Sequence, residues 1–157
     1  ILTGFGWAKP VGVNPMYYKD RKKGMALVGA AGPLMNFLLA VAAVILYGIY
    51  GIICSKLNFG LSSIKYVQTF VYIFVVRNLC FMVFNLIPIP PLDGSRIFTM
   101  FFSDRVYYTL MRYERYSMIL IMVLSLSGVF NSIIGTGVGF LSKLLFNGLN
   151  HMLSIFM

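Results

Sequence analysis

Residues 24–55 read GMALVGAAGPLMNFLLAVAAVILYGIYGIICS and contain no charged side chain. The run lies between Lys23 and Lys56 and is 32 residues long, where about 20 suffice for a helix to cross the hydrocarbon core of a bilayer. We therefore predict a membrane-spanning helix over residues 26–54. Small residues fill its first half, which lets neighbouring helices approach closely in lipid, and Pro33 should kink it.

Three further apolar runs follow the first one. Residues 66–87 carry one charge, Arg77, and stop at a proline-rich stretch; residues 116–133 are uncharged and long enough to cross. Residues 134–157 are interrupted by Lys143 and Asn147, which leaves open whether they cross the bilayer or lie at its surface. We expect one domain over residues 1–157: an all-α polytopic membrane protein, a bundle of three to four transmembrane helices with a short extended segment at residues 5–13.

The composition excludes an ordinary soluble protein. Of the 157 residues, 59% are hydrophobic and 11% are charged, against roughly 25% charged in a soluble domain. The net charge of +9 does not indicate nucleic acid as a partner, because the basic residues flank apolar runs instead of forming a polar face. The expected partner is the lipid bilayer. By the positive-inside rule the cytoplasmic side carries nine of these residues, against Lys56 and Lys65 opposite: Lys9, Lys19, Arg21, Lys22, Lys23, Arg96, Arg105, Arg112 and Arg115.

A few polar residues lie where lipid tolerates them poorly. Asp93 follows the proline-rich stretch, and a carboxylate at membrane depth costs about 2.5 to 3.5 kcal/mol on insertion scales. It needs a cation, a metal or water beside it, unless it is an interfacial residue solvated at the helix end or one that caps the next helix. Asn78 and Asn85 are seven apart, hence within about 20° on one helical face. Together with Asn36 they predict either a polar pocket or hydrogen bonds between helices.

Two motifs in this chain carry a family resemblance. Residues 85–94, NLIPIPPLDG, resemble the N-x-x-P-x-x-x-x-D-G motif of the site-2 protease family of intramembrane zinc metallopeptidases. Residues 32–36, GPLMN, resemble the G-P-x-x-N helix of that family, and residues 6–11, GWAKPV, are similar to the segment before it. The motifs occur in the right order and at the right distance, so the resemblance extends from about Gly6 to Arg115.

The resemblance implies a site and a reaction. Asp93 would be the third protein ligand of a catalytic Zn²⁺, Asn85 would help to hold the substrate carbonyl or oxyanion, and Asn36 would support the site. The implied reaction is cleavage of membrane-embedded segments of a membrane protein or peptide by zinc-activated water. The implied location is the plasma membrane of a bacterium, with the basic loops in the cytoplasm.

One family element is missing from these residues. The H-E-x-x-H helix, which supplies two zinc ligands and the general base, does not occur, and the one histidine is His151. Because that helix precedes the GWAKPV-like segment in the family, we expect it upstream of Ile1. The 157 residues alone are expected to be inactive, since one carboxylate holds zinc weakly. Two alternatives stay open: a catalytically inactive membrane pseudoprotease, and a small cation transporter or channel lined by Asn78, Asn85 and Asp93.

Overall fold

The computed structural model describes residues 14–57, 61–103, 105–106, 109 and 112–156. These residues form a short 3-10 helix, η1 (Pro15–Tyr17), and five α-helices: α1 (Arg21–Leu57), α2 (Leu61–Asn85), α3 (Asp93–Thr99), α5 (Glu114–Leu126) and α6 (Val129–Phe156). No strand occurs in the described part of the chain. The extended segment expected at residues 5–13 falls outside the described residues.

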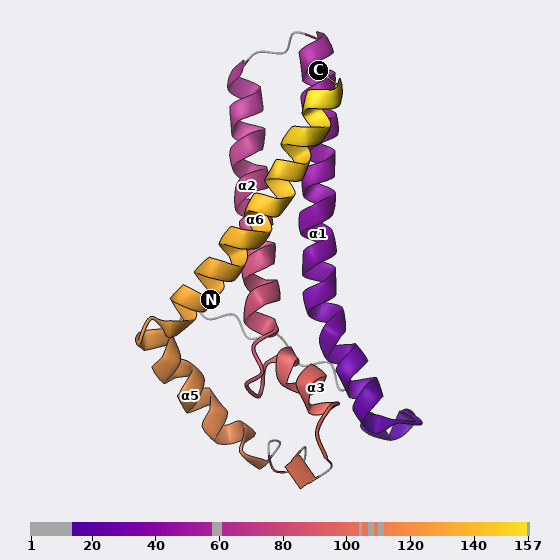
Figure 1. Cartoon of the computed structure of the whole chain (residues 1–157), viewed down its shortest axis with the longest axis vertical. Coiled ribbons are helices and arrows are strands. Elements are labelled where there is room, and N and C mark those ends of the chain that lie inside the picture. The colour runs from indigo at the N-terminus through magenta and orange to yellow at the C-terminus, as the bar shows by residue number, and fades with distance from the viewer. Residues whose placement is uncertain (1–13, 58–60, 104, 107–108, 110–111, 157) are drawn as a thin grey trace, which may run out of the picture.

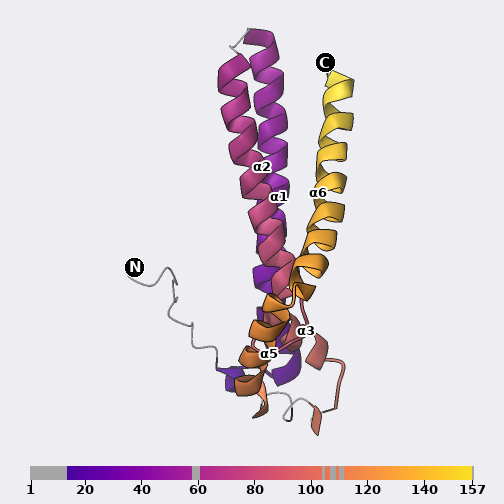
Figure 2. The same cartoon turned by 90° about the vertical axis from the view of Figure 1, so that its left-hand side faces the viewer.

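Three long helices make up the body of the molecule. α1 and α2 run side by side in opposite directions, and α6 crosses them at an angle (Figure 1). Seen from the side, α6 leans away from the α1–α2 pair towards its C-terminal end (Figure 2). Within the described residues, the three helices long and apolar enough to cross a bilayer cover 21–57, 65–85 and 129–151. The expectation of an all-α membrane protein with three to four such helices is confirmed.

The core of this bundle is built from small and branched side chains, which are spaced four residues apart on α1 and on α2. The buried set comes from all three long helices: Ala40, Val44, Val75, Leu79, Val138 and Leu149. Close approach depends on two glycines, since Leu149 of α6 lies against Gly48 of α1, and Val83 of α2 lies against Gly137 of α6. In lipid such small residues let dispersion contacts replace a hydrophobic driving force.

The boundary between the third and fourth apolar segments differs from the prediction. We expected spans at 116–133 and 134–157, but the helix breaks at Ser127 and Gly128. Gly128 has a φ of +79°, a left-handed conformation that ends a helix and favours glycine. The 13-residue α5 is therefore only about 20 Å long, which is too short to cross the bilayer. Residues 134–156, whose crossing the sequence left open, belong to the 28-residue α6.

The break also decides which end of the bundle α6 starts from. Phe130, in its first turn, is buried against Ile87 and Leu92, so the junction of α5 and α6 lies at the same end as α3 (Figure 1). With spans over 116–133 and 134–157, the turn between them would lie at the other end of the bundle. The structure instead places the start of α6 beside the loop that carries Asp93.

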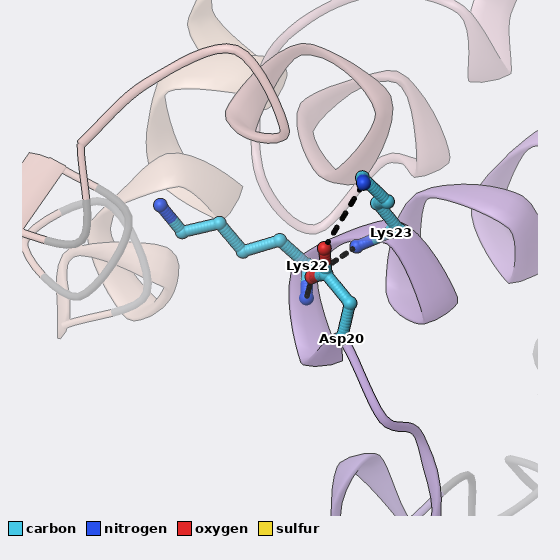
Figure 3. A network of polar contacts seen from close by, with 3 residues as sticks. All are labelled: Asp20, Lys22 and Lys23. Carbon is cyan, nitrogen blue, oxygen red and sulfur yellow. Dashed lines mark hydrogen bonds and ion pairs between the residues drawn. The ribbon is translucent and has the colours of Figure 1, made fainter.

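The first turn of α1 is held by a small polar network (Figure 3). Asp20 precedes the helix, and its Oδ1 accepts hydrogen bonds from the backbone N–H groups of Lys22 (3.1 Å) and Lys23 (3.2 Å). Its Oδ2 lies 3.5 Å from Nζ of Lys23. Nζ of Lys22 donates to the carbonyl oxygen of Phe102 at 2.8 Å, which ties the start of α1 to the chain beyond α3. The backbone hydrogen bonds satisfy donors that a helix start leaves unpaired.

These contacts predict a pH-dependent helix start. The hydrogen bond donated by the backbone N–H of Lys23 holds the pKa of Asp20 below its usual value of 3.8. A carboxyl with a lowered folded pKa adds stability above its unfolded pKa and loses it as the pH falls through the folded pKa. We expect Asp20→Asn, which keeps an acceptor, to unfold slightly earlier than the wild type at neutral pH. The difference in Tm should shrink as the pH falls below 3.8 and vanish below the folded pKa of Asp20; a difference that grows in acid would contradict this.

Candidate functional site

Asp93 lies where α2 has ended and α3 begins. Backbone hydrogen bonds from Ile87 to Phe84, from Ile89 to Ile87 and from Leu92 to Ile89 fold residues 86–92 into a series of turns. The prolines suit these turns because they cannot continue a helix and lack a backbone donor. The N-cap of α3 is Leu92, without a side-chain cap. Asp93 therefore does not cap the next helix, which removes one of its two structural interpretations.

Gly94 closes this loop against the end of α2. A Cβ at Gly94 would collide with the carbonyl group of Leu86, and it would lie 2.6 Å from the carbonyl oxygen of Ile87. Only a residue without a side chain can lie this close to the backbone. The contact brings Asp93 next to the carboxyl end of α2, where Asn85 is the last helical residue.

The start of α3 packs against two glycines of α1, Gly29 and Gly32. A Cβ at Gly29 would lie 2.9 Å from the backbone oxygen of Asp93 and 3.2 Å from Cβ of Arg96. A Cβ at Gly32 would lie 3.2 Å from Oδ2 of Asp93. The carboxylate of Asp93 thus points at α1, level with Gly32. The sequence shows small residues in this stretch without linking them to Asp93; the signal is the spacing of Gly29 and Gly32 on one helical face.

Asn36 extends the same face of α1. It lies four residues after Gly32 and seven after Gly29, within about 20° of the latter around the helix. Asn36 and Asn85 are both partly buried, and in the described part of the chain neither side chain makes a hydrogen bond. Their amides are available to a ligand. The structure thus brings Asp93 against the α1 face that also bears Asn36, and next to Asn85 at the end of α2.

Asn78 stands apart from this group. It is buried, with 9% of its surface exposed, and its Nδ2 donates to the carbonyl oxygen of Phe74 one turn earlier at 2.9 Å. Its amide nitrogen is thereby satisfied within its own helix, whereas a cation on a path lined by Asn78, Asn85 and Asp93 would bind the amide oxygen.

The surroundings of Asp93 favour its neutral form relative to water. Partial burial raises the pKa of the Asp93 carboxyl, and the positive charge of Arg96 offsets part of the rise. Among the described residues no hydrogen bond or ion pair reaches this carboxylate. A partly buried carboxyl without a partner at the edge of a membrane bundle is the kind of group that a cation would stabilise.

The residues present fit part of a metal site. Within the described residues no group of three His, Cys, Asp or Glu side chains could hold a metal ion. A catalytic zinc takes three protein ligands and leaves a fourth position open. Asp93 can supply one oxygen ligand of such a set. The C-terminal end of α6 lies at the opposite end of the molecule from α3 (Figure 1). His151 lies five residues before that end, so it does not complete the set.

Comparisons with known proteins agree with this reading of the motifs. The model of peptidase family M50, the site-2 protease family, matches residues 6–129. A Bacillus subtilis protein named "Putative zinc metalloprotease YwhC" is 34% identical over 128 residues, which cover 79% of this chain and 56% of that relative. The chain thus spans little more than half the length of the curated relative. No solved structure matches the chain significantly.

Proposed function

Because the chain belongs to peptidase family M50, we propose that the whole protein is an intramembrane zinc metalloprotease and that these 157 residues are part of its membrane domain. The observation that carries the proposal is the carboxylate of Asp93 held against Gly32 of α1, beside the end of α2 where Asn85 lies. This arrangement falls inside the stretch that the family model matches.

Each site residue has a role in this proposal. Asp93 would hold zinc as one ligand, and two imidazoles from outside these residues would complete the set. A zinc ion held in this way would supply a Lewis acid that activates water for attack on a peptide bond at neutral pH. Asn85 donates a hydrogen bond from its amide to the substrate carbonyl oxygen, where negative charge develops. Asn36 orients the site from α1.

The proposed substrates are helical segments of membrane proteins or peptides. Amides inside a helix are hydrogen-bonded and shielded, so a segment has to unwind locally before hydrolysis. α3 lies at the end of the bundle from which α1 starts (Figure 1). α1 begins with Arg21, Lys22 and Lys23, and Lys19 precedes it in the chain. We place this basic end in the cytoplasm of a bacterial cell by the positive-inside rule, which gives the site water from the cytosol.

Metal removal tests the proposal directly. We expect the purified full-length protein to contain about one zinc per chain and to cleave a labelled transmembrane peptide in detergent or liposomes. A chelator should lower cleavage by at least about 100-fold, and added Zn²⁺, but not Mg²⁺, should restore it because imidazole ligands disfavour Mg²⁺. If the purified protein contains no zinc and cleaves no peptide, the alternative of a catalytically inactive pseudoprotease is supported instead. Cleavage that is insensitive to chelation would contradict the metal mechanism.

A further inference from the structure

Two cations lie exposed within the membrane-crossing helices. Arg77 is on α2 and Lys143 is on α6, and both side chains are exposed. The membrane-crossing stretches are residues 65–85 of α2 and residues 129–151 of α6. Arg77 is two residues from the middle of the first stretch, and Lys143 is three residues from the middle of the second. At a rise of 1.5 Å per residue these offsets are about 3 Å and 5 Å. Both charges therefore lie close to the bilayer midplane.

The two cations also lie at about the same depth. α2 and α6 are antiparallel, and two contacts set their register: Val83 lies against Gly137, and the rings of Tyr72 and Phe146 are 5.9 Å apart. Arg77 lies between Tyr72 and Val83 along α2, and Lys143 lies between Gly137 and Phe146 along α6. They do not share a face, because Arg77 lies about 140° around α2 from Tyr72 and about 120° from Val83, the residues that contact α6.

No carboxylate within these helices can neutralise the two charges. The sequence has four acidic residues, all outside the crossing stretches: Asp20, Asp93, Asp104 and Glu114. Arg77 is about 12 Å along the helix from Asn85, farther than an arginine side chain extends when it snorkels to the interface. Lipid phosphates stay at that interface. A second copy of these 157 residues offers no acid at this depth either.

Around Arg77 the outer face of α2 has the pattern of a helix-packing surface. Exposed large side chains lie along this face at intervals of four, three, four and four residues: Tyr66, Phe70, Ile73, Arg77 and Phe81. This spacing forms one stripe along a helix. An ionisable residue inside such a stripe needs a polar partner, because charged side chains in membranes face protein or water, not lipid.

We propose that Arg77 marks the docking surface for a further membrane helix that carries an aspartate or glutamate near the midplane. We assign this helix to the remainder of the whole protein, since a permanent partner spares the bundle an uncompensated charge. The inference rests on the proposed function only in taking the whole protein to be longer than these residues. It concerns assembly, and its test does not depend on cleavage.

The sign of the stability change at Arg77 tests the proposal. In the full-length protein, Arg77→Leu should lower the Tm in detergent or nanodiscs by roughly 5 °C or more, because it strands the partner carboxylate. Arg77→Lys keeps the charge and should stay within about 2 °C of the wild type, as should Lys56→Leu at the end of α1. If Arg77 faces lipid instead, Arg77→Leu will leave the Tm unchanged or raise it, and the proposal is wrong.

Photo-crosslinking identifies the partner even if Arg77→Leu fails to fold. A benzoylphenylalanine at position 81, about one turn from Arg77, should cross-link in membranes to a transmembrane peptide of the same polypeptide that contains Asp or Glu. Exchanging the charges, with Arg77→Glu and the partner acid replaced by Arg, should restore the Tm lost in either single variant. Cross-links only to lipid, to a different polypeptide or to a helix without an acid would overturn the assignment.

Discussion

Replacing Asp93 by asparagine in the full-length protein is expected to lower cleavage of a transmembrane peptide on the order of 10³-fold or more, and to lower its zinc content in parallel. An amide oxygen carries no net charge and binds zinc far more weakly than a carboxylate. The fold should survive, because Asp93 makes no hydrogen bond in the described residues and does not cap α3. The loss should thus appear in activity and metal content while the Tm stays near that of the wild type.

Two further variants sharpen this prediction. Asp93→Glu keeps the charge but adds a methylene where Gly32 already leaves little space beside Oδ2, so we expect partial activity with weakened zinc binding. Asp20→Asn is the matched control, because Asp20 is an exposed aspartate at the start of α1 and plays no part in the site. Wild-type zinc content in Asp93→Asn would exclude Asp93 as a ligand.

The site residues could be proposed from sequence because their motifs are local. Asn85 and Asp93 are separated by a proline-rich loop with a fixed pattern, and Asn36 lies one turn after Gly32 and Pro33. Their mutual arrangement could not be predicted in this way. The contact of Gly29 and Gly32 with Asp93 depends on how residues 86–92 fold back, which is a tertiary feature. Glycine spacing on α1 indicates a close approach but does not name the partner.

The error at residues 116–134 has a different physical origin. Hydropathy is continuous from Tyr116 to Ile134, so a hydrophobic count detects no interruption. The helix nevertheless ends where Gly128 takes a positive φ, a backbone property that leaves no trace in hydropathy. Conversely, Lys143 and Asn147 made residues 134–157 seem marginal, yet both are exposed on an uninterrupted α6. In such a helix, polar residues indicate which face is covered by other protein. They are a less reliable guide to whether the helix forms.

The second large effect is expected at Gly94. In Gly94→Ala the new Cβ meets the backbone of Leu86 and Ile87, and backbone atoms held by hydrogen bonds to Met82 and Phe84 cannot turn aside as a side chain does. The loop must open, at a cost of about 2 to 4 kcal/mol. Because this loop holds Asp93 against α1, we expect a clear fall in Tm together with loss of zinc and cleavage.

Glycines in other surroundings provide graded controls for Gly94→Ala. Gly135 on α6 has nothing within 4 Å of an added Cβ, so Gly135→Ala should leave activity unchanged and stabilise the helix by up to about 1 kcal/mol. Gly32→Ala meets only the side-chain oxygen of Asp93, which can rotate away, so zinc binding should weaken while the Tm changes little. Thermal unfolding and zinc content of the three variants separate loss of fold from loss of site. Equal effects of Gly94→Ala and Gly135→Ala would show that the loop does not depend on the close contact at Leu86.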